Sequence, residues 1–121
     1  MAKTFIIAEV SANHNGSIEI AKKTMLAAKE AGVDAVKIQT YTADTITLDC
    51  DKEDFQIHGG LWDGYNLHTL YQEAYTPWEW HQELFEYAKK IDIILFSTPF
   101  DNTAVDLLEE CENPIYKIAS F

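Results

Sequence analysis

Polar and apolar residues alternate along residues 33–40, and this pattern predicts a short β-strand. Side chains on a strand alternate between its two faces, so Val36 and Ile38 share one face while Lys37 and Gln39 share the other. A lysine and a glutamine are costly to bury without partners. Taken alone, the segment is best explained as an edge strand whose Lys37 reaches solvent. The rest of the chain weakens that explanation, because other predicted strands carry polar residues in the same way.

Three further apolar runs have the length of strands, and polar residues lie near their C-terminal ends. The predicted strands are residues 4–10, 92–98 and 115–120, and their polar residues are Glu9, Thr98, Lys117 and Ser120. A single charged residue at a strand end is usually solvated at the rim of a sheet. Because polar residues recur at the ends of several predicted strands, the pattern instead favours a polar surface that these strands share.

Helical periodicity fills the intervals between these strands. The predicted helices are residues 17–31 with Ser17 as N-cap, a short helix over 65–74, residues 76–91 opened by a capping box in Thr76-Pro-Trp-Glu79, and residues 102–111 introduced by Asp101. The region 41–75 is otherwise irregular and long for a compact domain, which indicates a functional connection. Its tryptophan and tyrosines argue against disorder.

The predicted order β-α-β-α-β-α-β indicates a parallel sheet with helical crossovers. It fits either an open doubly wound sheet or part of a (β/α)₈ barrel. No Gly-x-Gly-x-x-Gly follows the first strand, and polar strand ends are typical of barrel enzymes. A complete barrel takes roughly 250 residues. We therefore expect an α/β fold in which about four parallel βα units form the first half of a TIM barrel, within a longer protein.

The net charge of −11, from 20 acidic and 9 basic residues, argues against nucleic acid or an anionic membrane as a partner. It does not exclude a small anionic substrate, which needs only a few local cations. Cys50 and Cys111 lack CxxC spacing and are expected to be free thiols. The sequence shows no signal peptide and no apolar stretch of membrane-spanning length, so a cytoplasmic location is expected.

If the four strands are parallel neighbours, their polar residues converge at one end of the sheet. Two inward lysines with threonine and serine hydroxyls suit a phosphate or carboxylate ligand, and Glu9 would relieve the repulsion between the lysines. None of the four histidines has metal-ligand spacing, so each is expected to be a surface or satisfied residue: His14, His58, His68 and His81.

Four motifs resemble the N-terminal half of the sialic acid synthase family, in the order in which that family has them. They are Ile7-Ala-Glu-Val-Ser-Ala-Asn-His-Asn-Gly16, Val36-Lys-Ile-Gln-Thr40, Phe96-Ser-Thr-Pro-Phe100 and Tyr116-Lys-Ile-Ala-Ser120. Within the family, Gly60-Leu-Trp-Asp-Gly64 and Tyr71-Gln-Glu-Ala-Tyr-Thr-Pro-Trp-Glu-Trp-His81 resemble the pseudaminic acid synthase branch. The resemblance covers essentially the whole chain.

The resemblance implies a TIM-barrel transferase that condenses phosphoenolpyruvate with an acylated amino sugar and releases phosphate. It implies a 2,4-diacetamido-2,4,6-trideoxy hexose as the sugar, with N-acetylmannosamine, the substrate of N-acetylneuraminate synthases, as the alternative. By motif position, Lys37 and Lys117 would be the catalytic lysines that hold phosphoenolpyruvate. The substrate-binding residues would be Glu9, Asn13, His14, Gln39, Thr98 and Ser120.

The resemblance also implies parts that residues 1–121 do not contain. The family's catalytic glutamate would follow Phe121, and the histidines that bind a divalent metal, commonly manganese, would lie on later strands. The antifreeze-like domain that closes the site across a homodimer would come later still. Residues 1–121 are thus expected to be a truncated N-terminal part of the barrel domain, inactive alone. Two other hypotheses stay open, namely a Schiff-base aldolase that uses Lys37 or Lys117, and a non-catalytic half-barrel that self-associates.

Overall fold

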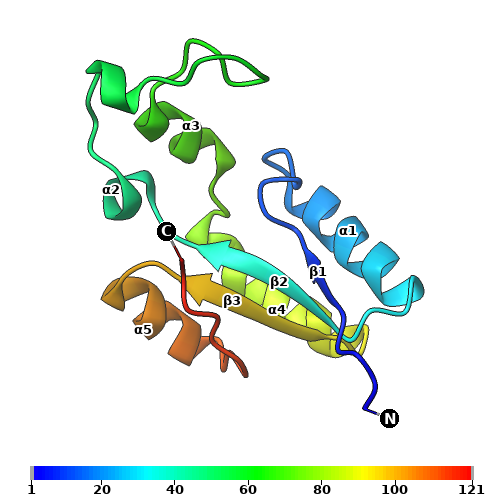
Figure 1. The fold of residues 1–121 in the computed structure, drawn as a ribbon. Helices are drawn as coiled ribbons and strands as arrows, with labels where there is room; N and C mark the ends of the chain where they lie inside the picture. The colour runs from blue at the N-terminus through cyan, green and yellow to red at the C-terminus, as the bar shows by residue number, and fades with distance from the viewer. Residues whose placement is uncertain (1, 121) are drawn as a thin grey trace.

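Three parallel strands form the centre of the computed structural model, which describes residues 2–120. They lie side by side in chain order (Figure 1): β1 (Ile7–Glu9), β2 (Ala35–Thr40) and β3 (Ile94–Pro99). The edge-strand explanation of Lys37 is wrong, because β2 pairs with both β1 and β3. Pairing places Glu9 beside Lys37, and Gln39 beside Thr98, so the predicted polar residues do share a face.

The helices that link the strands cover only one face of the sheet. Figure 1 shows α4 behind β2 and β3, with α1 and α5 to either side of it. The bounds of these helices are α1 (Ile18–Glu30), α4 (His81–Lys90) and α5 (Asn102–Glu110). Val36, Ile38 and Leu95 point from the strands into the core that these helices complete. The helical contribution to that core includes Ala21, Met25, Leu84, Phe85, Ala88 and Leu108.

Short polar side chains set the starts of two of these helices as predicted. The Ser17 side chain accepts a hydrogen bond from the backbone N–H of Ile20, and Asp101 accepts from Thr103 and Ala104. Each side chain supplies an acceptor for N–H groups of the first turn, which have no partner within the helix. The start predicted at Thr76 is wrong. Pro77 has an extended backbone with ψ 133°, so Thr76 is not an N-cap, and the helix is preceded by a 3₁₀ turn, η2 (Trp78–Trp80).

The three helix-to-strand turns share one geometry. α1, α4 and α5 are each followed by a residue with positive φ, namely Gly32 (85°), Asp92 (58°) and Glu112 (57°). The next residue then donates its N–H to a carbonyl five positions back, as Val33 does to Ala28, and the positive-φ residue donates to a carbonyl three positions back. This is the Schellman arrangement. Glycine adopts a positive φ without strain, whereas a side chain such as that of Glu112 is uncommon in the left-handed region.

Hydroxyl groups join β2, β3 and α4 on the covered face. Thr40 Oγ1 lies 2.8 Å from His81 Nε2 and 2.6 Å from Ser97 Oγ, and all three side chains are buried. Ser97 Oγ also donates to the carbonyl of Ile38 at 3.2 Å. Burial lowers the pKa of His81. His81 is therefore a satisfied structural residue, as expected from its lack of metal-ligand spacing.

The long connection from β2 to α4 is ordered and lies beyond the C-terminal ends of the strands (Figure 1). It contains α2 (Ala43–Ile46), the 3₁₀ turn η1 (Glu53–Phe55) and α3 (Leu67–Ala74). The short helix was predicted, whereas α2 and η1 were not. Edge-to-face contacts of Tyr41 with Tyr71 and Phe100, at 5.8 Å and 5.4 Å between ring centroids, hold the connection against the sheet. The Trp78 indole N–H donates to the Tyr41 carbonyl at 3.0 Å.

The predicted fourth strand, 115–120, does not form as a strand. Its contact with the sheet is one parallel bridge between Ser97 and Tyr116, with the Lys117 N–H donating to the Ser97 carbonyl at 3.3 Å. Ile115 and Ile118 are exposed. Within residues 2–120 nothing pairs with the outer side of this segment, and its inner side meets β3 only at that bridge. β1 is likewise shorter than the predicted 4–10.

Candidate functional site

Lys37 is the centre of the cluster that the sequence predicted on the open face of the sheet. Its ammonium lies 2.7 Å from Glu9 Oε2, in the neighbouring strand β1, and 3.3 Å from Thr98 Oγ1 in β3. Lys37 is held at the middle of the sheet because β2 is the central strand. The three side chains thus come from three strands and meet where the strands end, which is the usual place for ligands in parallel α/β folds.

The surroundings of Lys37 leave its charge available to a ligand. Its side chain is 12% exposed, whereas that of Glu9 is 42% exposed. A largely buried ammonium next to an accessible carboxylate is compensated without a ligand, and the carboxylate can turn to solvent when an anion takes its place. Thr98 is buried and can donate its hydroxyl to an anionic oxygen. The cluster is suited to binding a phosphate or carboxylate group, with the Lys37 ammonium as the cation and the Thr98 hydroxyl as a neutral hydrogen-bond donor.

The other predicted lysine stands apart from this cluster. Lys117 is exposed, and the Ser97–Tyr116 bridge places it next to Thr98 in register. No hydrogen bond joins its ammonium to the Lys37 cluster within residues 2–120. Gln39 is half-buried one strand position beyond Lys37, beside Thr98. Ser120 lies farther along the C-terminal segment, where it lines a separate hollow. The structure thus brings together Glu9, Lys37, Gln39 and Thr98 more closely than Lys117 and Ser120.

Asn13 and His14 lie in the turn between β1 and α1, and their side chains serve that turn. The Asn13 side-chain amide donates to the Val10 carbonyl at 2.9 Å. His14 is buried and accepts the Gly16 N–H on Nδ1 at 3.1 Å, while its ring packs edge-to-face on Trp80. Burial lowers the pKa of His14. Its Nε2 is buried and makes no hydrogen bond of good geometry among residues 2–120, although the Ala74 backbone lies near the ring.

Sequence reasoning missed a hollow of about 480 Å³ at the same end of the sheet. It is lined by Thr45, Ile46, Tyr71, Phe100, Ala119 and Ser120. These residues come from α2, α3, the end of β3 and the C-terminal segment. The only sequence signal for it was the unusual length of the 41–75 region. That signal could not show which residues of the region face the sheet.

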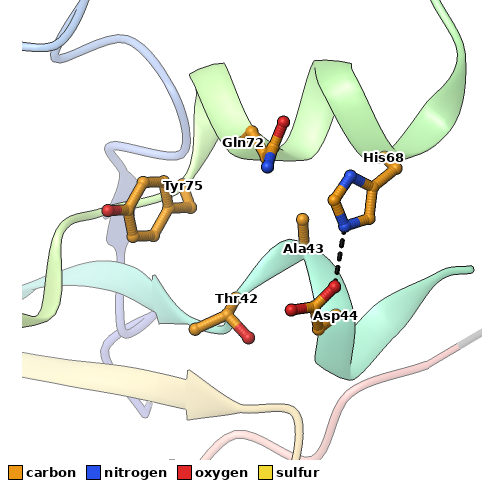
Figure 2. Close-up of a pocket in the computed structure, with 6 residues that line it drawn as sticks. All are labelled: Thr42, Ala43, Asp44, His68, Gln72 and Tyr75. Carbon is orange, nitrogen blue, oxygen red and sulfur yellow. Dashed lines mark hydrogen bonds and ion pairs between the residues drawn. The ribbon is translucent and has the colours of Figure 1, made fainter. Parts of the chain in front are cut away.

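A second pocket, of about 300 Å³, lies between α2 and α3 (Figure 2). His68 Nε2 lies 2.8 Å from Asp44 Oδ1 across it, and the wall continues with Gln72 on α3 and Tyr75 just after the helix. His68 is buried and was expected to be a satisfied residue, which its contact with Asp44 confirms. This pair ties the two helices of the connection together.

A metal site does not form from the residues at hand. Within residues 2–120, no three histidine, cysteine, aspartate or glutamate side chains are grouped so that they could hold a metal ion. Cys50 and Cys111 are free thiols, as predicted. In the same part of the chain, no helix is both long enough and apolar enough to cross a membrane.

Comparison with known proteins agrees with the motifs. A sequence model of the NeuB family matches residues 24–121. The chain belongs to the NeuB family. That match includes Lys37, Gln39, Thr98, Lys117 and Ser120, while Glu9, Asn13 and His14 precede it. Among curated NeuB-like relatives, the pseudaminic acid synthase of Campylobacter jejuni is 56% identical over 119 residues, which are 98% of this chain and 35% of that protein.

Other relatives show the same relation. The pseudaminic acid synthase of Helicobacter pylori is 53% identical over 116 residues, covering 96% of this chain and 34% of that protein. Among solved structures, the N-acetylneuraminic acid synthetase of Leptospira borgpetersenii superposes with a TM-score of 0.78 at 26% identity, over 97% of this chain and 36% of that one. The chain therefore spans about a third of the length of the relatives it matches.

Proposed function

We propose that this chain is part of a pseudaminic acid synthase-like transferase. The reaction joins phosphoenolpyruvate to a 2,4-diacetamido-2,4,6-trideoxy hexose and gives a nine-carbon 2-keto sugar acid and phosphate. The observation that carries the proposal is the Glu9–Lys37–Thr98 cluster, in which a cation, a hydroxyl and an accessible carboxylate meet at the ends of three parallel strands. The 56% identity to a pseudaminic acid synthase over 98% of the chain supports this choice of substrate.

The same proposal describes residues 1–121 as the N-terminal part of a TIM-barrel domain. Two features support a barrel over a doubly wound sheet. The strands lie in sequential order, and the connecting helices pack on one face only, whereas a doubly wound sheet carries helices on both faces. The open face would then line the barrel interior. Further strands would pair with β1 and with the 115–120 segment, which would allow that segment to become a full strand.

In the proposed reaction, Lys37 and Lys117 hold the phosphate and carboxylate of phosphoenolpyruvate. Thr98 and Ser120 donate hydroxyl hydrogen bonds to the same anion, and Gln39 lines the pocket. C3 of phosphoenolpyruvate attacks the open-chain aldehyde of the sugar and forms the new carbon–carbon bond. Water adds at C2, and the phosphate leaves as the C2 ketone forms. Lys37 favours this path because Glu9 and Thr98 hold it in place before charge moves onto the leaving phosphate.

On the sugar side of the site, Glu9 is the proposed contact for the sugar. Its carboxylate is accessible and is already oriented by Lys37. Asn13 and His14 shape the floor of this side from the turn between β1 and α1. The family resemblance also implies a divalent metal, but residues 2–120 do not group three metal-ligating side chains. No step is therefore assigned to a metal here.

A Schiff-base aldolase fits the cluster less well. Such a lysine reacts as a neutral amine in a dry, apolar pocket. Lys37 instead lies 2.7 Å from an accessible carboxylate. Borohydride treatment with a carbonyl substrate separates the two reactions, since only the aldolase leaves a covalent adduct on lysine.

A non-catalytic module that self-associates has one observation in its favour. Large apolar side chains are exposed on and around the open face of the sheet: Ile6, Ile7, Ile94, Ile115 and Ile118. Exposed apolar area of this kind marks a surface that is covered in the assembled protein. The barrel proposal covers it with further strands of the same protein, and the module proposal covers it with a second copy of this chain.

The deciding experiment is a phosphate-release assay with the complete protein that contains this chain. We expect release of phosphate only when phosphoenolpyruvate and an acylated amino sugar are both present. The product is expected to be a 2-keto acid that carries all nine carbons. The excised chain 1–121 is the matched control and is expected to release none. A complete protein that binds neither substrate, with the excised chain forming a stable dimer, would overturn the proposal in favour of the module.

A further inference from the structure

We propose that the hollow between α2, α3 and the C-terminal segment binds the uncharged, methyl-bearing side of an acylated deoxy amino sugar. The inference rests on the proposed function, because it names the part of the site that distinguishes one acylated sugar from another. It assigns a role to residues of the β2–α4 connection that the motifs left without one. The hollow of about 480 Å³ has the size of ordinary small-molecule pockets.

The position of the hollow makes it a neighbour of the anion-binding residues. The Ser97–Tyr116 bridge places Lys117 beside Thr98, in the row next to Lys37. Two residues farther along each segment, Phe100 and Ala119 both line the hollow. The hollow therefore lies just beyond the lysines, on the side where the strands end. A substrate whose reacting carbon meets phosphoenolpyruvate over Lys37 would extend into it.

The lining of the hollow is chemically unlike the lysine cluster. None of its lining residues is charged, and Ile46, Tyr71, Phe100 and Ala119 present mostly apolar atoms. Of its three hydroxyls, which belong to Thr45, Tyr71 and Ser120, that of Thr45 already donates to the Thr42 carbonyl at 2.9 Å. Ser120 is exposed and remains to bond an acyl amide. A sugar hydroxyl that faces Ile46, Phe100 or Ala119 would lose its water without gaining a partner, whereas a methyl group there would gain apolar contact.

The wall of the hollow formed by Tyr71 and Phe100 is fixed before any ligand arrives. Tyr71 and Phe100 both pack edge-to-face on Tyr41, which is 4% exposed. The Phe100 N–H also donates to the Thr40 carbonyl at 3.2 Å. Burial raises the pKa of Tyr41 to about 12, which agrees with its position behind the two rings that line the hollow. A preformed apolar wall discriminates through shape and hydration, with little cost for ordering side chains on binding.

The test measures sugar binding to the complete protein with a pair of probes that differ in one hydroxyl. The probes are N-acetylmannosamine and its 6-deoxy analogue, titrated by calorimetry without phosphoenolpyruvate so that no turnover can occur. We expect the 6-deoxy analogue to bind about 10-fold more tightly, since one group in an apolar pocket is typically worth about 10-fold to 200-fold. Ile46→Ser is expected to reduce that preference to about threefold or less.

Two further variants control the interpretation. Leu48→Ser makes a similar apolar-to-polar change two residues away, at a side chain that is 69% exposed and does not line the hollow, and should keep the wild-type preference. Ala119→Leu fills the hollow from its opposite wall and should weaken binding of the 6-deoxy analogue about 10-fold. Melting temperatures close to that of the wild type show that the variants are folded.

The outcomes separate this inference from the proposed function. A wild-type protein without the preference, or a preference that survives both Ile46→Ser and Ala119→Leu, overturns the role of the hollow. Phosphate release by such a protein would still leave the synthase reaction in place. Conversely, a preference that Ile46→Ser removes supports the role of the hollow even if no phosphate is released, and in that case the proposed reaction is the part that fails.

Discussion

The two faces of the sheet use the same three strands for opposite purposes. On the covered face, Val36 and Ile38 pack into a core with side chains of α1, α4 and α5. On the open face, the residues between them, Lys37 and Gln39, are half-buried and polar. A shift of one residue in the register would exchange the two sets. The core therefore fixes the position of the charged cluster as firmly as it fixes the strands themselves.

The two faces also differ in whether their polar groups are buried or reached by water. The Thr40, Ser97 and His81 side chains on the covered face are buried and bonded to one another. The Glu9 carboxylate on the open face is accessible, although it bonds Lys37. Buried polar groups that satisfy one another add rigidity, whereas a pair that water can reach can exchange one partner for a ligand. The substitutions below test this difference.

The largest effect is expected on the covered face. Leu84→Ala removes a side chain that is 1% exposed and leaves a cavity between α4 and the sheet. The free energy of unfolding should fall by about 2–5 kcal/mol, as is typical of buried leucines. Chemical denaturation of the complete protein measures it. Leu61→Ala, at a side chain that is 89% exposed, is the matched control and should change the stability by less than about 0.5 kcal/mol.

On the open face, Lys37→Met should affect binding far more than folding. The methionine keeps most of the apolar stem, and the accessible Glu9 carboxylate can turn to water. Binding of phosphoenolpyruvate should weaken about 100-fold, since a charge-assisted contact in a shielded site is lost. Calorimetric titration measures the affinity. Lys89→Met removes a lysine from an exposed ion pair with Glu112 and should leave it unchanged. Equal affinities in both variants would contradict the role of Lys37.

Thr40→Val tests whether the hydroxyl network on the covered face stabilises the fold. The change removes the hydroxyl that lies between His81 Nε2 and Ser97 Oγ and leaves both without this partner. Stability should fall by about 1–3 kcal/mol, the usual cost of leaving a buried polar group unpaired. Thr24→Val, which removes a hydroxyl bonded to a carbonyl on the surface of α1, is the control and should have a smaller effect. No difference between the two would show that the network adds no stability.

The smallest effect concerns pH. Burial lowers the pKa of His81 in the folded protein, so the unfolded chain binds more protons below its ordinary pKa of about 6.5. Stability should therefore fall as the pH drops from 7 toward 5.5, by at most about 1.4 kcal/mol per pH unit from this residue. Denaturation midpoints across that range measure the slope. His81→Asn should flatten it, and an unchanged slope would contradict the assignment to His81.

Much of the fold could be predicted because it depends on local patterns. Alternation along 33–40 predicted which side chains of β2 share a face, and the Ser17 and Asp101 caps predicted two helix starts. The meeting of Glu9, Lys37 and Thr98 followed from parallel pairing of strands whose polar residues lie near their ends. These conclusions needed no knowledge of distant contacts beyond strand order.

The failures have a common physical origin in contacts between segments far apart in the sequence. Thr76 has the sequence of an N-cap, but the Trp78 side chain is held by the Tyr41 carbonyl, and Pro77 stays extended. Residues 115–120 have the composition of a strand, but they meet β3 in one bridge only, and no segment within residues 2–120 pairs with their other side. The hollow beside α2 depends on how the long connection folds back over the sheet. Local propensity contains none of this information.

The repeated turns at Gly32, Asp92 and Glu112 make one end of the molecule uniform. At the other end, the connections that lead from strand to helix differ greatly: residues 10–17, 41–80 and 100–101. The helix-to-strand turns thus form a common frame, and the strand-to-helix connections vary on top of it. Because the frame is set at the uniform end, the 41–80 connection can be exchanged for that of a relative with its strands left in place. Under the proposed function, changes in this connection would alter the sugar preference, as long as the residues that pack on the sheet, such as Tyr41 and Trp80, are kept.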